Sequence, residues 1–335
     1  MDLPKDLRAA LDDAVARVPV TDIATAVDRL IARYRTGGEA GRPILTSVAD
    51  VTAYAAYRMP ATYAAVRAAL TQVALAAPAL APRSLLDVGG GTGAASWAAA
   101  DTYPTITDIT VIDQVAEALA LGRQLSSRTS ALPLPTATWR QARIDAVDLP
   151  PADLVMISYV LGELAGVDQS DLVRRAAATG DVTVIVEPGT PAGYGRILAA
   201  RAALIDGGLS VVAPCPHQGR CPMQPGQDWC HFAARVNRSA LHRRLKNAEL
   251  GYEDEKFSYV ATARAPAATP PGRVLRHPQQ RKGLVSLQVC TSADGIVREQ
   301  VSKRQGDSYR AARDVAWGDA WPPPAQPPPA QPPPG

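Results

Sequence analysis

Residues 86–93 read Leu86-Asp87-Val88-Gly89-Gly90-Gly91-Thr92-Gly93, and this stretch decides the fold. The short apolar run 84–88 predicts a buried strand that ends in a glycine loop, and the alanine-rich run 94–100 predicts a helix after it. Glycine permits positive φ angles and a close approach of ligand to backbone, while the start of a helix offers free N–H groups. The stretch therefore predicts a strand, a nucleotide-binding loop and a helix.

Further strands and helices follow from the residues on either side of this loop. Apolar runs at 109–113, 153–158 and 182–187 are separated by stretches long enough for helices, which predicts a parallel, doubly wound sheet. The second of the strands ends in Asp113, whose carboxylate is placed to accept hydrogen bonds from ribose hydroxyls. Residues 5–35 predict either one helix or a pair broken near Pro19, and residues 48–80 predict a helical stretch interrupted at Pro60. Together they predict an N-terminal helical region.

The pattern Asp-x-Gly-x-Gly-x-Gly resembles motif I of class I methyltransferases, which bind S-adenosylmethionine. The cofactor-binding residues expected from the loop and the next strand are Asp87, Gly89, Gly91, Gly93 and Asp113. Two other interpretations remain open. Gly89, Gly91 and Ala94 also match the dinucleotide pattern G-x-G-x-x-G/A, and a tight strand-to-helix turn needs no ligand at all.

The four cysteines form a second pattern. Cys215, Cys221 and Cys230 lie in one loop rich in Pro and Gly, and Cys290 follows much later in the chain. Four thiolates suit zinc or a [4Fe–4S] cluster. The paired Cys-x-x-Cys knuckles of zinc ribbons are missing and Cys-Pro occurs twice, which favours iron–sulfur over Zn²⁺. A mixed zinc site that uses His217 or His231, and plain buried cysteines, are the alternatives.

Lys and Arg outnumber Asp and Glu in residues 201–335, although the net charge of the chain is only +3. A basic half suits a polyanionic partner such as RNA. We expect an amphipathic helix from about residue 231 to residue 250, with a basic exterior formed by Arg235, Arg238, Arg243, Arg244 and Lys246. A second basic stretch contains Arg273, Arg276, Arg281 and Lys282. Ordinary solvated surface charge is the alternative.

With these motifs in place, the chain resembles the methyltransferase-like small-ribosomal-subunit protein family, whose mitochondrial members serve small-subunit assembly and which has bacterial relatives. The resemblance covers most of residues 45–322. Its motifs are residues 54–63, 86–93, 186–190, the cysteine loop closed by 229–232, residues 281–283 before Cys290, and residues 317–322.

This resemblance implies an α/β, class I methyltransferase (Rossmann-like) fold with a mostly parallel sheet, an N-terminal helical region and a Cys-rich metal-binding insertion. It also implies a [4Fe–4S] cluster held by Cys215, Cys221, Cys230 and Cys290, and association with the rRNA of the small ribosomal subunit.

Four regions are expected along the chain. They are an N-terminal helical region (1–80), a methyltransferase core that binds S-adenosylmethionine (81–213), a region with the cysteine loop, the basic helix and late strands completing the sheet (214–320), and a Pro-rich disordered tail (321–335). The late strands are expected at 257–263, 283–290 and 296–302. No apolar run reaches the roughly 18 residues of a membrane helix, and the acidic first residues are unlike a signal or transit peptide. We therefore expect a cytoplasmic monomer.

The sequence predicts no catalytic residue. The end of the fourth strand reads Ser158-Tyr159-Val160-Leu161, without the acidic/Asn-Pro-Pro-aromatic motif of amino-group methylases. Glu163 and Glu187 lie near strand ends, where a general base can sit. Three functions are compatible with these patterns: an rRNA methyltransferase, a catalytically inactive rRNA-binding assembly factor, and a zinc-bearing methyltransferase for small molecules.

Overall fold

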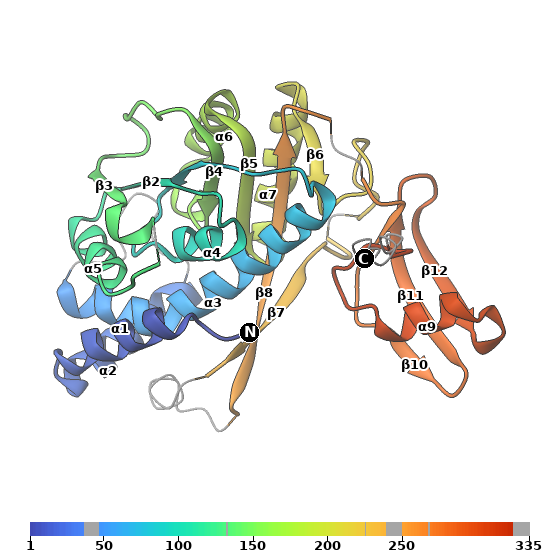
Figure 1. The fold of residues 1–335 in the computed structure, drawn as a ribbon, viewed down its shortest axis with the longest axis horizontal. Helices are drawn as coiled ribbons and strands as arrows, with labels where there is room; N and C mark the ends of the chain where they lie inside the picture. Colours follow the sequence, from blue (N-terminus) through green and yellow to red (C-terminus); the bar gives the residue numbers. More distant parts are fainter. Residues whose placement is uncertain (37–46, 132, 225, 239–249, 267–268, 324–335) are drawn as a thin grey trace, which may run out of the picture.

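The computed structural model of the protein describes residues 1–36, 47–131, 133–224, 226–238, 250–266 and 269–323. A large lobe of helices around a long mixed sheet fills the left and centre of Figure 1, and a smaller second lobe lies at the right. No helix among the described residues combines the length and the apolar character that a membrane span requires.

The helices α1 (Lys5–Ala16), α2 (Val20–Thr36) and α3 (Val48–Ala76) precede the first strand. Of the two alternatives for residues 5–35, the pair of helices broken near Pro19 is the one observed. The predicted interruption at Pro60 is wrong, because α3 continues through this proline. A proline inside a helix removes one backbone hydrogen bond. That loss is offset here by burial, since α3 packs against α4 (Ala94–Thr102) and against the main sheet along much of its length.

Within the described residues, the main sheet has the strand order β3-β2-β1-β4-β5-β8-β6. The strands on this path are β1 (Ser84–Val88), β2 (Asp108–Asp113), β3 (Thr138–Gln141), β4 (Ala152–Ser158), β5 (Gly180–Pro188), β6 (Ser210–Ala213) and β8 (Tyr252–Ala263). The first five pair in parallel, and β8 runs antiparallel between β5 and β6. The predicted α/β, methyltransferase-like, mostly parallel sheet is confirmed.

Helices cover both faces of this sheet (Figure 1). The helices α3, α4 and α5 (Ala116–Ser126) lie on one face, while α6 (Gly166–Thr179) and α7 (Pro191–Asp206) lie on the other. Short 3-10 turns occur at η1 (Leu134–Thr136) and η2 (Leu161–Glu163). Leu85 joins the apolar core on the α3 side and Leu86 joins the core on the α7 side. Successive side chains of a strand point to opposite faces, so a sheet covered on both faces needs continuously apolar strands.

The strand β7 (Phe232–Asn237) forms an antiparallel hairpin with the first half of β8. The predicted basic helix is therefore wrong over 232–237, and residues 239–249 lie outside the described part of the chain. Phe232, Ala234 and Val236 are buried, whereas Ala233 is half-buried and Arg235 and Asn237 are exposed. This alternation has the period of two residues that is typical of a half-buried strand. The helix had been predicted because basic and apolar residues of the segment also recur at helical spacing.

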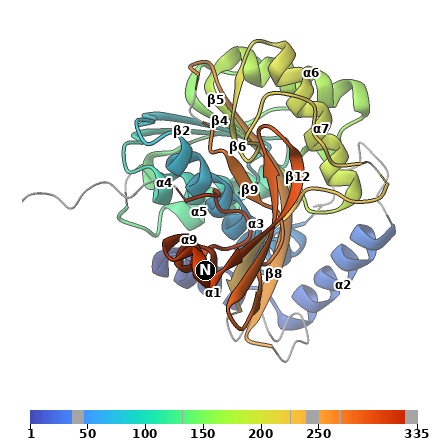
Figure 2. The ribbon, with the colours of Figure 1, turned by 90° about the vertical axis from the view of Figure 1, so that its right-hand side faces the viewer.

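The second lobe has its own sheet, built from β9 (Gly272–Val274), β10 (Gln279–Arg281), β11 (Leu284–Thr291) and β12 (Gly295–Ser302). The turn η3 (Lys303–Gln305) and the helix α9 (Asp307–Asp314) follow. Figure 2 shows this lobe from the front, with α9 to one side of β12. The late strands thus divide: the one predicted at 257–263 completes the main sheet, and the other two form a separate sheet.

One buried arginine joins the second lobe to the large lobe. Arg273 on β9 is only 2% exposed. It donates to the carbonyl oxygens of Pro214 at 2.8 Å and Gly318 at 2.9 Å, and to the side chain of Gln72 on α3. It was expected to belong to a basic surface, but its guanidinium is used inside the protein.

Replacing Arg273 by lysine should lower the free energy of unfolding by about 2 kcal/mol, because an ammonium cannot reach three acceptors that a planar guanidinium serves. Urea unfolding of the full chain measures this. The same change at the exposed Arg281 is the control and should stay within about 0.5 kcal/mol of wild type. Equal stability of both variants would show that Arg273 does not tie the lobes together.

Candidate cofactor cleft and cysteine pocket

The glycine loop is built around a buried carboxylate. Asp87 at the end of β1 accepts hydrogen bonds from the backbone N–H of Ser96 at 3.1 Å and from its hydroxyl at 2.7 Å, which fixes the start of α4. A Cβ atom on Gly90 would lie 2.6 Å from the Asp87 carboxyl carbon, so this position admits only glycine. Burial raises the pKa of Asp87 to about 6.

Two predicted cofactor residues lie beneath the cleft rather than on its wall. The Oδ1 oxygen of Asp87 is buried and has no hydrogen-bond partner among the described residues. Gly93 has a φ of 85° and packs against the indole of Trp139, which a Cβ atom would approach to 2.7 Å. Asp87 and Gly93 therefore shape the loop, whereas Gly89, Gly91 and Asp113 line the cleft itself.

The cleft lies at the carboxyl ends of β1, β2 and β4. Its walls are formed by Tyr54, Gly89, Gly91, Asp113, Gln114, Val115, Ala118, Ile144, Ser158, Tyr159, Val160 and Glu163. Asp113 accepts from the N–H groups of Gly91 at 2.9 Å and Val115 at 2.8 Å, and burial raises its pKa. Each carboxylate oxygen keeps a second lone pair, so Asp113 can still accept from ribose hydroxyls.

Glu163 is a cleft residue to which the sequence assigned no definite role. Burial, together with the nearby carboxylates of Asp113 and Glu187, raises the pKa of Glu163 to about 7. Glu187 differs, because Arg196 donates to it at 2.6 Å and the Leu161 N–H at 3.0 Å. Glu187 thus holds the turn after β4, and Glu163 is the one of these two glutamates that lines the cleft.

Tyr159 stands directly after β4, in the place where amino-group methylases carry their catalytic motif. Among the described residues other than glycine, it is the one with a positive φ, 61°. Its hydroxyl donates to Glu255 on β8 at 3.0 Å, and Arg58 on α3 forms a bidentate ion pair with the same carboxylate at 2.8 and 3.2 Å. The only sequence signals for this arrangement were the strand end and the motif at 54–63.

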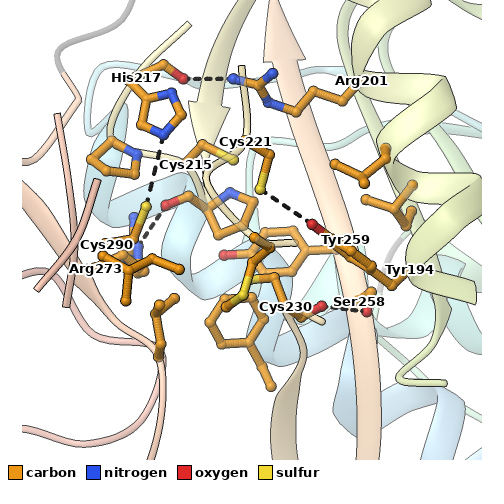
Figure 3. A pocket seen from close by; sticks show the side chains of 18 residues that line it. Tyr194, Arg201, Cys215, His217, Cys221, Cys230, Ser258, Tyr259, Arg273 and Cys290 are labelled. Carbon is orange, nitrogen blue, oxygen red and sulfur yellow. Dashed lines mark hydrogen bonds between the residues drawn. The ribbon is translucent and has the colours of Figure 1, made fainter. Parts of the chain in front are cut away.

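The four cysteines line one pocket between the two lobes (Figure 3). Cys215, Cys221 and Cys230 come from the segment between β6 and β7, and Cys290 comes from β11 of the second lobe. The structure thus brings together all four residues predicted as metal ligands. The sulfur of Cys221 lies 3.2 Å from the Tyr194 hydroxyl, and that of Cys290 lies 3.7 Å from Nε2 of His217.

All four thiols are free of disulfide bonds. Burial raises the pKa of Cys290 to about 12, and it also raises the pKa values of Cys215 and Cys230, with the other cysteines adding to the effect on Cys230. A thiol with such a pKa is neutral at physiological pH. Cys215, Cys230 and Cys290 are therefore poor free nucleophiles, and each must lose its proton to become a metal ligand.

The predicted metal site is not present as a single-ion site. Over the described residues, no three His, Cys, Asp or Glu side chains are gathered closely enough to hold one metal ion. Sulfurs that share one zinc at about 2.3 Å lie roughly 3.8 Å from each other. The pocket gathers the right residue types at a looser spacing, and His217 and His231 do not complete a mixed site.

Two of the predicted RNA-binding residues form ion pairs, and two others are exposed at the surface of the second lobe. Arg235 pairs with Asp254 at 2.8 Å, and Arg238 pairs with Glu253 at 2.8 Å. The other three predicted cations of this segment, Arg243, Arg244 and Lys246, lie outside the described residues. Arg281 and Lys282 are exposed at the turn between β10 and β11.

The chain is similar to two solved structures whose names describe them as methyltransferases. Magnesium protoporphyrin IX methyltransferase from Synechocystis PCC 6803 is 13% identical, with a TM-score of 0.42 over 74% of this chain and 100% of that chain. Human N-acetylserotonin methyltransferase is 17% identical, with a TM-score of 0.39 over 78% of this chain and 67% of that chain. At these scores the likeness carries no argument, and the fold assignment rests on the strand order.

Two curated relatives have names that concern mitochondria. The human mitochondrial ribosome assembly protein METTL17 is 30% identical over 295 residues, which cover 80% of this chain and 62% of that protein. Mitochondrial Rsm22-cox11 tandem protein 2 of Schizosaccharomyces pombe is 25% identical over 324 residues, which cover 82% of this chain and 43% of that protein. The chain thus spans less than two thirds of either relative.

These relatives correct one prediction. A cytoplasmic location was expected from the sequence, and it is contradicted because the named relatives are all mitochondrial proteins. The resemblance to a small-subunit protein family is confirmed. The family model described as mitochondrial small ribosomal subunit Rsm22 matches residues 48–322, and the chain belongs to that family.

Proposed function

We propose that this protein is a methyltransferase-like assembly factor of the small ribosomal subunit that binds S-adenosylmethionine, holds a [4Fe–4S] cluster and contacts rRNA. One observation carries the proposal. Four cysteines from two separate lobes line a single pocket, although Cys290 is far from the other three in the sequence. The family membership and the name of the human relative support the ribosomal part.

The cleft has the groups that S-adenosylmethionine needs. The unpartnered Oδ1 of Asp87 is a buried acceptor beneath the glycine loop. Asp113 on the cleft wall can accept from the ribose hydroxyls, and Gly89 and Gly91 let the cofactor approach the backbone of the loop closely. Bound there, the cofactor supplies a methyl group on a sulfonium centre. Tyr54 on α3 and Val115 before α5 close the sides of the cleft.

The pocket residues fit a [4Fe–4S] cluster better than zinc. Four thiols and no carboxylate line the pocket, which is the donor set of such clusters. A four-iron cluster is larger than one ion, so its ligands stand further apart than the roughly 3.8 Å of a tetrahedral zinc site. In this assignment Cys215, Cys221, Cys230 and Cys290 hold the cluster as thiolates, and the cluster joins the second lobe to the large lobe.

Two activities are open to the cleft, and a different residue favours each. Glu163, with a pKa of about 7, can accept a proton from an RNA acceptor group, which favours methyl transfer. Tyr159, fixed by Glu255 and Arg58, fills the position of the missing amino-methylase motif, which favours an assembly factor without transfer. Incubation of the protein with isotope-labelled donor and small-subunit rRNA separates the two. Label in the RNA indicates an enzyme, and donor binding without label indicates a binding factor.

Capture of the intact protein from cells tests the ribosomal part. The proposal predicts enrichment of small-subunit rRNA over large-subunit rRNA. Equal recovery of the two rRNAs, or recovery of neither, would contradict it.

The affinity for S-adenosylmethionine should rise roughly tenfold between pH 6 and pH 8, because Glu163 ionises over this range and its carboxylate then attracts the cationic donor. The same shift has the opposite effect on stability. The pKa of Glu163 is near 4.5 in the unfolded chain and about 7 in the folded protein. The stability that this carboxyl contributes is therefore fully present below pH 4.5 and is lost as the pH rises through about 7.

Wild type and Glu163→Gln are compared across this pH range. Isothermal titration with the donor measures the affinity, and urea unfolding measures the stability. The variant should bind the donor with little dependence on pH and should lose less stability on the alkaline side. A variant as dependent on pH as wild type would exclude Glu163 as the responsible group.

A further inference from the structure

The two faces of the second sheet differ in character. Val285, Leu287 and Val289 of β11 pack with Val301 of β12 in a core that also contains Trp321 and Ala312 of α9. Successive residues of a strand point to opposite sides. The residues between these valines and leucines therefore form a second face, turned away from α9.

Most residues on this second face of β10, β11 and β12 are polar, and none of them is a carboxylate. We call six of them the polar face: Gln279 and Arg281 on β10, Ser286 and Gln288 on β11, and Arg298 and Gln300 on β12. Leu284 lies on the same side. The register sets them side by side, because Ser286 pairs with both Gln279 and Gln300, and Gln288 pairs with Arg298. Both arginines of the polar face are exposed.

The acidic residue of β12 does not weaken this positive character. Glu299 points to the opposite face, where its carboxylate accepts from the indole N–H of Trp321 at 2.7 Å. Asp307, at the start of α9, pairs with Arg310 instead of with a cation of the polar face. The arginines of the polar face thus meet no carboxylate within the described part of β10, β11 and β12.

More cations gather at one end of the polar face. Lys282 lies in the turn between β10 and β11, and Lys303 and Arg304 follow β12; all three are exposed. The N–H of Lys303 donates to the carbonyl of Gly283 at 2.9 Å, so the two segments are adjacent. Five exposed cations therefore lie on or beside one small sheet.

The other end of the polar face leads into the cysteine pocket. Cys290 and Ile296 are opposite each other in the register and both line that pocket. Cys290 lies two residues beyond Gln288 on the same strand and Ile296 lies two residues before Arg298, so both belong to the same side of the sheet. One side of this sheet therefore carries exposed cations at one end and a buried thiol of the cysteine pocket at the other.

We propose that the polar face binds the sugar-phosphate backbone of RNA. This inference rests on the proposed association with rRNA and assigns it to a surface. Arginine and lysine neutralise phosphates, and glutamine and serine side chains hydrogen-bond to phosphate and ribose oxygens. The hairpin cations Arg235 and Arg238 fit this role less well, because both already pair with carboxylates.

The double variant Arg281→Gln/Arg298→Gln tests the assignment in the full chain. Its affinity for a single-stranded fragment of small-subunit rRNA, measured by fluorescence anisotropy, should fall roughly tenfold at moderate salt. The slope of log affinity against log salt should become shallower by about 1.4, which corresponds to the loss of two phosphate contacts. The matched control is Arg17→Gln/Arg128→Gln, which removes the same charge from exposed positions beside α1 and α5 and should bind like wild type.

The outcomes separate the possible failures. If wild type binds rRNA and the two double variants bind it equally well, the polar face is not the RNA surface, although the proposed function stands. If wild type has no affinity for rRNA, the proposed RNA association fails, and the inference fails with it. If the variant keeps its RNA affinity and loses only its binding to intact small subunits, the face binds a ribosomal protein, which overturns the RNA assignment.

Discussion

Replacing Cys290 by serine is expected to remove most of the bound iron and to lower the melting temperature by roughly 5 °C, since ligand binding that exists only in the folded state contributes to stability. Cys290 is the one predicted ligand that comes from the second lobe, so its loss also removes the proposed link between the lobes. Iron analysis and calorimetry of the anaerobically purified protein measure the two effects.

Two comparisons isolate the contribution of the cluster. Thr291→Ser changes the neighbouring residue of the same strand and should keep both the iron and the melting temperature. After chelation of the metal, wild type and Cys290→Ser should melt at nearly the same temperature. Full iron content in Cys290→Ser would exclude this residue as a ligand.

Replacing Asp113 by asparagine is expected to weaken the binding of S-adenosylmethionine roughly a thousandfold. Two charge-assisted hydrogen bonds to the ribose, each worth about 1.5–3 kcal/mol, become weaker or are lost. In wild type, Asp113 accepts hydrogen bonds from the N–H groups of both Gly91 and Val115. The amide of asparagine places its NH₂ group, which cannot accept, against one of these two N–H groups. Isothermal titration with the donor measures the change.

The matched control for this prediction lies on the same strand. Asp108→Asn alters the exposed carboxyl at the opposite end of β2 and should leave donor affinity within about twofold of wild type. If both variants bind the donor equally well, the cleft at the end of β2 is not the donor site.

The parallel part of the fold could be predicted from the sequence because its signals are local. The loop from Asp87 to Gly93 has a defined geometry, and strands covered on both faces must be continuously apolar. The four cysteines could be selected because few residue types serve as soft metal ligands, and the structure places them in one pocket. The predicted helix over β7 failed because the segment fits a helical pattern as well as a strand pattern, and the partner strand β8, which decides between them, lies further along the chain.

Other features could not be predicted because they depend on contacts between distant residues. Tyr159 is fixed by Glu255 and Arg58, which come from β8 and α3. The buried role of Arg273 depends on Pro214 and Gly318, and no local pattern distinguishes it from the exposed Arg281. The division of the late strands into two sheets is likewise set by pairing partners rather than by strand propensity.

The iron and acid-labile sulfide content of the anaerobically purified full chain tests the central claim most directly. A cluster shared by the four cysteines predicts about four iron atoms and about four sulfides per chain. One zinc per chain with no iron or sulfide, in protein that is fully folded, would contradict the account.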